Sequence, residues 1–129
     1  MNLVELLVTL TIISILAGVS MNTYRKFTIE TSRSEAKTAL AQAQVWVERY
    51  LIENNTAQLP TLPVDLNTTN YALSLNQTSN TDASNGLYYL QATAISSSAQ
   101  NNDEKNCKTL KLYQNGVKQD GNGTVNSCW

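Results

Sequence analysis

Histidine is absent from this chain of 129 residues, which also holds only five glycines, two prolines and two cysteines. The missing histidine removes the commonest general base and the commonest metal ligand. Cys107 and Cys128 form no CxxC pair and are too few for a zinc cluster. The only adjacent carboxylates after residue 100, Asp103 and Glu104, would point apart in a strand or a loop. We therefore expect no enzyme activity, no metal and no cofactor.

Charge is scarce in one long apolar run, residues 3–21, where Glu5 is the only charged side chain. Its length is close to the roughly 20 residues that cross a bilayer as a helix, so we expect it to span a membrane. The first basic residues, Arg25 and Lys26, follow the run, which would place the rest of the chain in the cytoplasm. A polar, Asn- and Thr-rich remainder with a cysteine pair suits an oxidising exterior instead. A short basic leader, removed before Met1, would reconcile the two, and we expect the processed form.

Glu5 is the residue of this run that needs a physical explanation. An ionised carboxylate inside a bilayer is costly and is by default functional. Its place in the first helical turn is favoured by the helix dipole, by about 0.3–1 kcal/mol, which is the purely structural interpretation. The functional alternative is an ion pair with the free amine of Met1 in the next subunit. Head-to-tail contacts of this kind do not close, so they build a helical filament.

The first ten residues, MNLVELLVTL, resemble the mature N-terminus of the type IV pilins and pseudopilins. The resemblance continues through Tyr24 to residues 47–56 and returns at residues 107–112 and at Cys128–Trp129, where the chain is most similar to the PilE-like pilins of Gram-negative bacteria. It implies cleavage by a prepilin peptidase before Met1, N-methylation there, and assembly through Met1 and Glu5.

Three positions depart from the pattern of this family. The family usually starts with phenylalanine, and Met1 is a tolerated variant that leaves the inference unchanged. Many type IV pilins have glycine at residue 14 and proline at residue 22, around a stretch that loses helicity in assembled filaments, but this chain has Ser14 and Asn22. Gly18 is the strongest helix-weakening residue that is left. We place any melted segment of the assembled filament between Gly18 and Asn22.

The pattern predicts an α+β fold, the type IV pilin fold, with one long N-terminal helix packed on a three- or four-stranded antiparallel sheet. Residues 1–24 are expected to form a protruding apolar helix, transmembrane before assembly and in the filament core afterwards. Residues 25–129 are expected to form the globular head, with an amphipathic helix at 25–54, a loop at 55–70, and a sheet and disulfide-bounded region at 71–129. Within the head, strands are predicted at 71–75, 87–95, 109–114 and 117–119, because apolar and polar residues alternate there. The pair Asn115-Gly116 is a strong hairpin signal.

Cys107 and Cys128 are expected to form a disulfide, which would stabilise the fold by about 3 kcal/mol. A reactive thiol pair is the alternative. Trp129 is expected either to anchor the C-terminal segment by packing or to offer an exposed ring for stacking.

These features predict a structural subunit of a type IV pilus, a homopolymer in an extracellular filament that serves adhesion, twitching motility or DNA uptake. Its expected partners are other pilins, the inner-membrane assembly platform and, before assembly, the inner membrane. The alternative is a minor, priming or tip pilin, or a DNA-receptor pilin of natural transformation. DNA is considered because basic residues gather late in the chain, where a nucleic-acid backbone or another surface could contact Lys105, Lys108, Lys111, Lys118 and Trp129.

Overall fold

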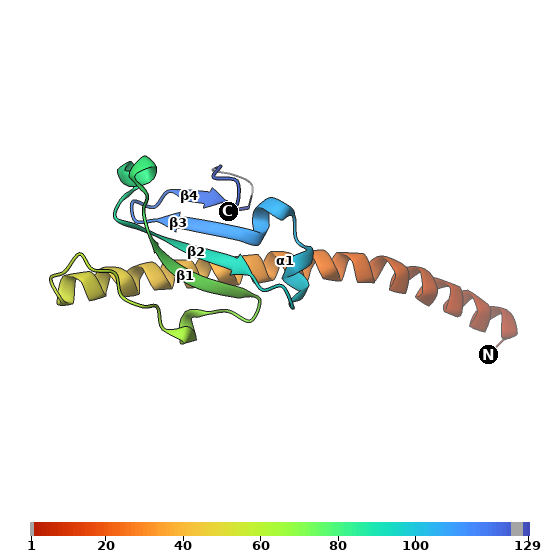
Figure 1. Cartoon of the computed structure of the whole chain (residues 1–129). Coiled ribbons are helices and arrows are strands. Elements are labelled where there is room, and N and C mark those ends of the chain that lie inside the picture. Colours follow the sequence, from red (N-terminus) through yellow and green to blue (C-terminus); the bar gives the residue numbers. More distant parts are fainter. Residues whose placement is uncertain (1, 125–127) are drawn as a thin grey trace. The chain divides into compact units, whose positions relative to one another are not determined.

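The computed structural model describes residues 2–124 and 128–129 and divides the chain into two compact units, Met1–Thr31 and Ser32–Trp129. The helix α1 (Leu3–Glu53) is followed by the strands β1 (Tyr71–Gln77), β2 (Tyr88–Ala94), β3 (Thr109–Tyr113) and β4 (Lys118–Asp120). The strands form one antiparallel sheet in the order β1-β2-β3-β4 (Figure 1). The predicted α+β fold, with one long N-terminal helix and an antiparallel sheet, is confirmed.

The first unit is the apolar part of α1. Its described side chains from position 2 to position 27 are exposed, and its most apolar 18-residue window has no buried residue. By length and composition, α1 is the one helix among the described residues that could cross a membrane. Within this segment the hydroxyl groups of Thr11 and Ser14 each donate to the carbonyl four residues earlier, at 2.8 Å. Such bonding removes the cost of a bare hydroxyl in an apolar surrounding.

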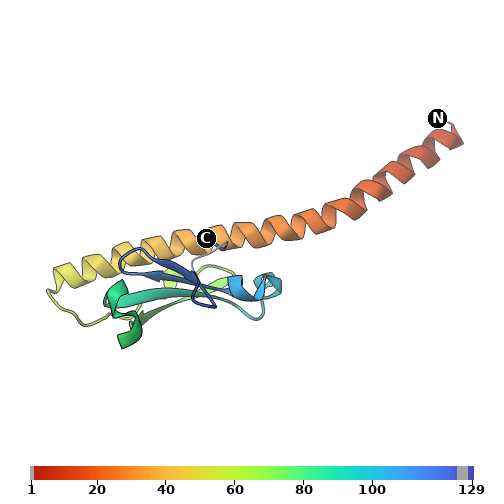
Figure 2. The ribbon, with the colours of Figure 1, turned by 90° about the horizontal axis from the view of Figure 1, so that it is seen from above.

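In the second unit, the C-terminal part of α1 lies across one face of the sheet, so this unit has two layers (Figure 2). The buried face of the helix consists of Ala36, Leu40, Ala43 and Val47, spaced four, three and four residues apart. That is the predicted stripe of a 3.6-residue period. Tyr71, Leu90 and Leu110, one from each of the first three strands, are fully buried against it.

The hairpin turn between β3 and β4 contains a glycine with positive φ. Asn115-Gly116 closes the hairpin between β3 and β4, with Gly116 at a φ of +88° and its N–H donating to the Tyr113 carbonyl at 2.9 Å. No strand is predicted for residues 76–86, but β1 extends to Gln77, and Asn80–Asn85 form a short 3₁₀ helix. Ser79 starts that helix, because its carbonyl accepts from the Asp82 N–H at 3.0 Å.

A buried polar network ties α1 to the connection between β2 and β3. Arg33 donates to both carboxylate oxygens of Asp103, at 2.6 Å and 3.2 Å. The Gln100 amide donates to Asp103 at 2.8 Å and to the hydroxyl of Tyr71 at 2.9 Å. That hydroxyl in turn donates to the carbonyl of Cys107, at 3.3 Å. The network thus leads from the helix to the disulfide, where Cys107 is joined to Cys128 as expected.

Candidate nucleic-acid interface

The late lysines, predicted as one group, are divided between the two faces of the sheet. Side chains alternate along a strand, and Leu110 and Leu112 of β3 are buried under α1, so Lys111 lies on the outer face. Lys118 of β4 pairs with Leu112, which puts it on the helix side. The sheet therefore separates Lys111 from Lys118.

On the helix side, Lys118 lies over the indole ring of Trp129, with its Nζ 5.4 Å from the ring centroid. The indole Nε1–H donates to the carbonyl of Gln119 at 2.9 Å, and the half-buried ring packs against the core. The disulfide of Cys128 holds the neighbouring residue in place. The ring of Trp129 is thus packed, as the first expected role requires, and the face considered for stacking already carries a lysine.

Lys37 of α1 is a second lysine of this region, because the charge of Lys118 acts on it. Lys37 is half-buried, and burial lowers its pKa, as do the nearby positive charges of Arg33 and Lys118. Arg33 is paired with Asp103, and among the described residues neither Lys37 nor Lys118 forms an ion pair. We call Lys37, Lys118 and Trp129 the helix-side cluster.

Lys37 was missed in the sequence because only the late lysines were counted. One signal was present: Lys37 follows Arg33 by four residues, so both lie on one side of the amphipathic helix, next to its buried stripe.

On the outer face, Lys111 makes a similar contact with a tyrosine. Its Nζ lies 5.6 Å from the ring centroid of Tyr89, and that ring lies 5.3 Å from the ring of Tyr113. Tyr113 is buried, so it offers no free ring. Lys105 and Lys108 belong to neither pair and lie in a short 3₁₀ helix, Lys105–Lys108, around Cys107.

The assembly residues are described only in part. Glu5 accepts a hydrogen bond from the backbone N–H of Asn2 at 3.4 Å, which matches the structural interpretation of a first-turn carboxylate. Met1 lies outside the described residues. Gly18 and Asn22 are helical in this single chain, so a melted segment in the filament stays a prediction.

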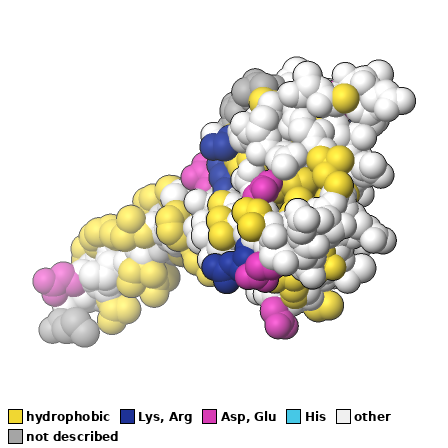
Figure 3. Space-filling model, turned by 90° about the vertical axis from the view of Figure 1, so that its left-hand side faces the viewer, with side chains coloured by type: hydrophobic (Ala, Val, Ile, Leu, Met, Phe, Trp, Pro, Cys, Tyr) yellow, Lys and Arg dark blue, Asp and Glu magenta, His cyan; other side chains and the backbone are white. Residues whose placement is uncertain are grey.

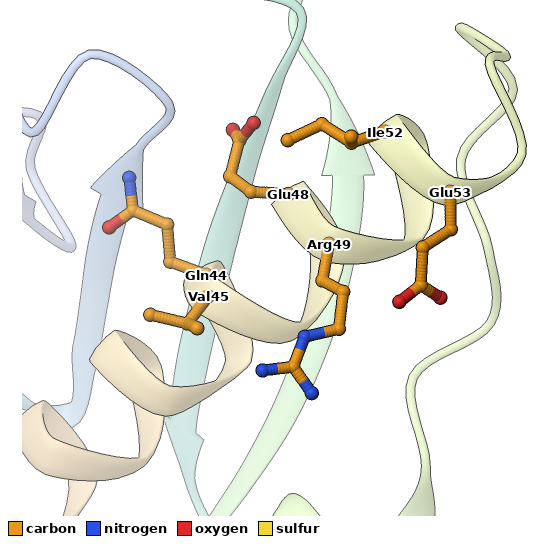
Figure 4. A pocket seen from close by; sticks show the side chains of 6 residues that line it. All are labelled: Gln44, Val45, Glu48, Arg49, Ile52 and Glu53. Carbon is orange, nitrogen blue, oxygen red and sulfur yellow. The ribbon is translucent and has the colours of Figure 1, made fainter.

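Figure 3 shows one face on which Lys and Arg form small separate groups among uncharged polar atoms and apolar side chains. An open pocket has six lining residues, all from α1: Gln44, Val45, Glu48, Arg49, Ile52 and Glu53 (Figure 4). Among the described residues, no group of three or more His, Cys, Asp or Glu could hold a metal ion.

Comparison with known proteins assigns the sequence of this chain to a family. Residues 22–111 match the family model described as "Type IV minor pilin ComP, DNA uptake sequence receptor". No curated protein and no solved structure matches the chain. The match confirms the resemblance to type IV pilins, while a particular closeness to the PilE-like branch stays a prediction. Because the matched residues cover more than half of the chain, it belongs to the ComP family of type IV minor pilins.

Proposed function

We propose that this chain is a low-abundance pilin that binds DNA on the outside of a type IV pilus, as a receptor for DNA uptake. This was the alternative reading of the sequence, and the description of the family favours it over the role of main structural subunit. The observation that carries the proposal is the helix-side cluster, where Lys118 lies over the Trp129 ring and its charge acts on Lys37, in a chain with a formal net charge of −1. Two neighbouring lysines that form no ion pair among the described residues suit the phosphates of a nucleic-acid backbone.

The strength and salt dependence of DNA binding test this proposal. The full chain, held in nanodiscs of neutral lipid, is titrated into a fluorescent 20-base-pair duplex while anisotropy is measured. If two to three phosphates are contacted, the affinity should fall about ten- to forty-fold between 50 and 200 mM salt. Lys37→Ala and Lys118→Ala should each weaken binding, whereas Lys26→Ala in the first unit is the matched control and should not. Binding at neither salt concentration would end the proposal.

Assembly is the second part of the proposal. The chain is anchored in the inner membrane by residues 1–24, with residues 25–129 as the exposed head, and then enters an extracellular filament with other pilins through the assembly platform. There Glu5 pairs with the Met1 amine of a neighbouring subunit. Counting this chain against other pilins in sheared filaments tests its abundance. A few copies per filament would support a minor pilin, whereas a majority share would favour the main structural subunit, with its adhesive or motile role.

A further inference from the structure

The position of Lys118 depends on the ring beneath it. The ring of Trp129 is held by its packing against the core, by the Nε1–H bond to the carbonyl of Gln119, and by the adjacent disulfide of Cys128. Gln119 directly follows Lys118 in β4. The ring is therefore tied to the same strand that carries the lysine, and the two are held together as a unit.

The Trp129 ring offsets the repulsion that the Lys118 ammonium group experiences from the positive charge of Lys37. Burial lowers the pKa of Lys37, and the positive charges of Arg33 and Lys118 add to this effect, as expected for neighbouring like charges. A flexible lysine would move away from a like charge, but the negative face of an indole ring attracts an ammonium group. At an exposed site this attraction corresponds to about a two- to five-fold shift in equilibrium.

We propose that Trp129 is a positioning residue of the DNA site: its ring holds the Lys118 ammonium beside Lys37, ready for a phosphate, and does not itself stack on a base. The inference rests on the proposed function. Stacking needs an open ring face, and here a base could reach the face under Lys118 only by displacing the lysine. Lys118 therefore gives affinity through charge, and Trp129 acts through Lys118.

A double-mutant cycle on DNA affinity tests this, using the full chain in neutral nanodiscs and the 20-base-pair duplex. Trp129→Leu keeps an apolar side chain but removes the ring, and should weaken binding about two- to five-fold in the wild-type background. In the Lys118→Ala background the same change should have no further effect. Trp129→Phe, which keeps a ring, should retain most of the affinity.

The salt dependence separates positioning from direct contact. Lys118→Ala should lower the slope of log affinity against log salt by about 0.9, since one phosphate contact is lost. Trp129→Leu should leave the slope unchanged, because the charge is still present. A purely structural role for Trp129 would lower the urea midpoint and would show no coupling to Lys118 in DNA binding.

Lys111 and Tyr89 supply a matched control, with the same type of contact on the other face of the sheet. Tyr89→Leu should leave DNA affinity unchanged. An equal loss from Trp129→Leu with and without Lys118 would overturn the inference in favour of stacking, while DNA binding itself would stand. If the wild-type chain binds no duplex, the proposed function fails first, and this inference fails with it.

Discussion

Replacing Asp103 with alanine should destabilise the second unit by about 3 kcal/mol, the lower end of the range for breaking one partner of a buried ion pair. The Asp103 side chain is only 3% exposed, and that of its partner Arg33 is 16% exposed. Alanine would leave a largely buried guanidinium without its carboxylate. It would also remove one acceptor of the Gln100 amide, which would keep its bond to Tyr71. Because water still reaches Arg33 in part, we do not expect the upper end of the range, about 5 kcal/mol.

The assay is urea unfolding of the full chain in detergent micelles, followed by tryptophan fluorescence. Both tryptophans, Trp46 and Trp129, lie in the second unit and report on it. Asp65→Ala is the matched control, because Asp65 is exposed and its loss should change the free energy of unfolding by less than about 0.5 kcal/mol.

A double variant shows whether the lost stability comes from an unpaired charge or from lost side-chain packing. Arg33→Met combined with Asp103→Leu removes both charges and should recover part of the stability, since no uncompensated charge remains. A loss below about 1 kcal/mol for Asp103→Ala would refute the reasoning. So would a double variant that is as unstable as the single one, because the damage would then not come from an unpaired charge.

The elements of the fold were predictable because their signals are local. The helix could be read from a stripe at a 3.6-residue period, in which Ala36, Leu40, Ala43 and Val47 are indeed buried. The strands could be read from alternation, and the last hairpin from Asn115-Gly116, where the structure has the expected positive φ. Because one face of the helix and one face of each strand are buried, apolar residues recur every 3.6 residues in the helix and every two residues in the strands. A single sequence is enough to show both periods.

The contacts that shape the candidate site were not predictable in the same way. Arg33 and Asp103 are 70 residues apart in the chain, and no spacing rule joins them. In the structure Arg33 is paired with Asp103, and the charge of Lys118, from far along the chain, adds to the effect of burial on the pKa of Lys37. Net charge of a segment can be counted, but the face on which each charge lies depends on tertiary pairing.

The remaining predictions concern a turn, the assembly carboxylate and acid stability. Gly86→Ala should destabilise the fold by about 3 kcal/mol, because Gly86 has a φ of +112° and a Cβ there would lie 2.6 Å from the Cβ of Gln114. Gly116 has a φ of +88°, but a Cβ there would meet no atom within 4 Å. Gly116→Ala should therefore lower the free energy of unfolding by only about 1 kcal/mol in the same urea assay. Glu5→Ala should leave membrane insertion intact while filament yield falls, and a normal yield of sheared filaments would show that the intersubunit pair is unnecessary. Asp120→Asn should make the stability of the fold less sensitive to acid. Burial raises the pKa of Asp120, but hydrogen bonds from the residues that follow it, including the backbone N–H groups at positions 122 and 124 at 2.9 Å, outweigh this and lower the pKa below its usual 3.8. Because the pKa is lower in the folded chain, this carboxylate stabilises the fold fully above its unfolded pKa, and the contribution is lost as the pH falls through the folded pKa. The urea midpoint of the wild type should therefore fall more steeply between pH 5 and pH 2, which runs from about one unit above the unfolded pKa to about two units below it, than that of Asp120→Asn. Parallel curves for the two proteins would show that the Asp120 charge does not stabilise this loop.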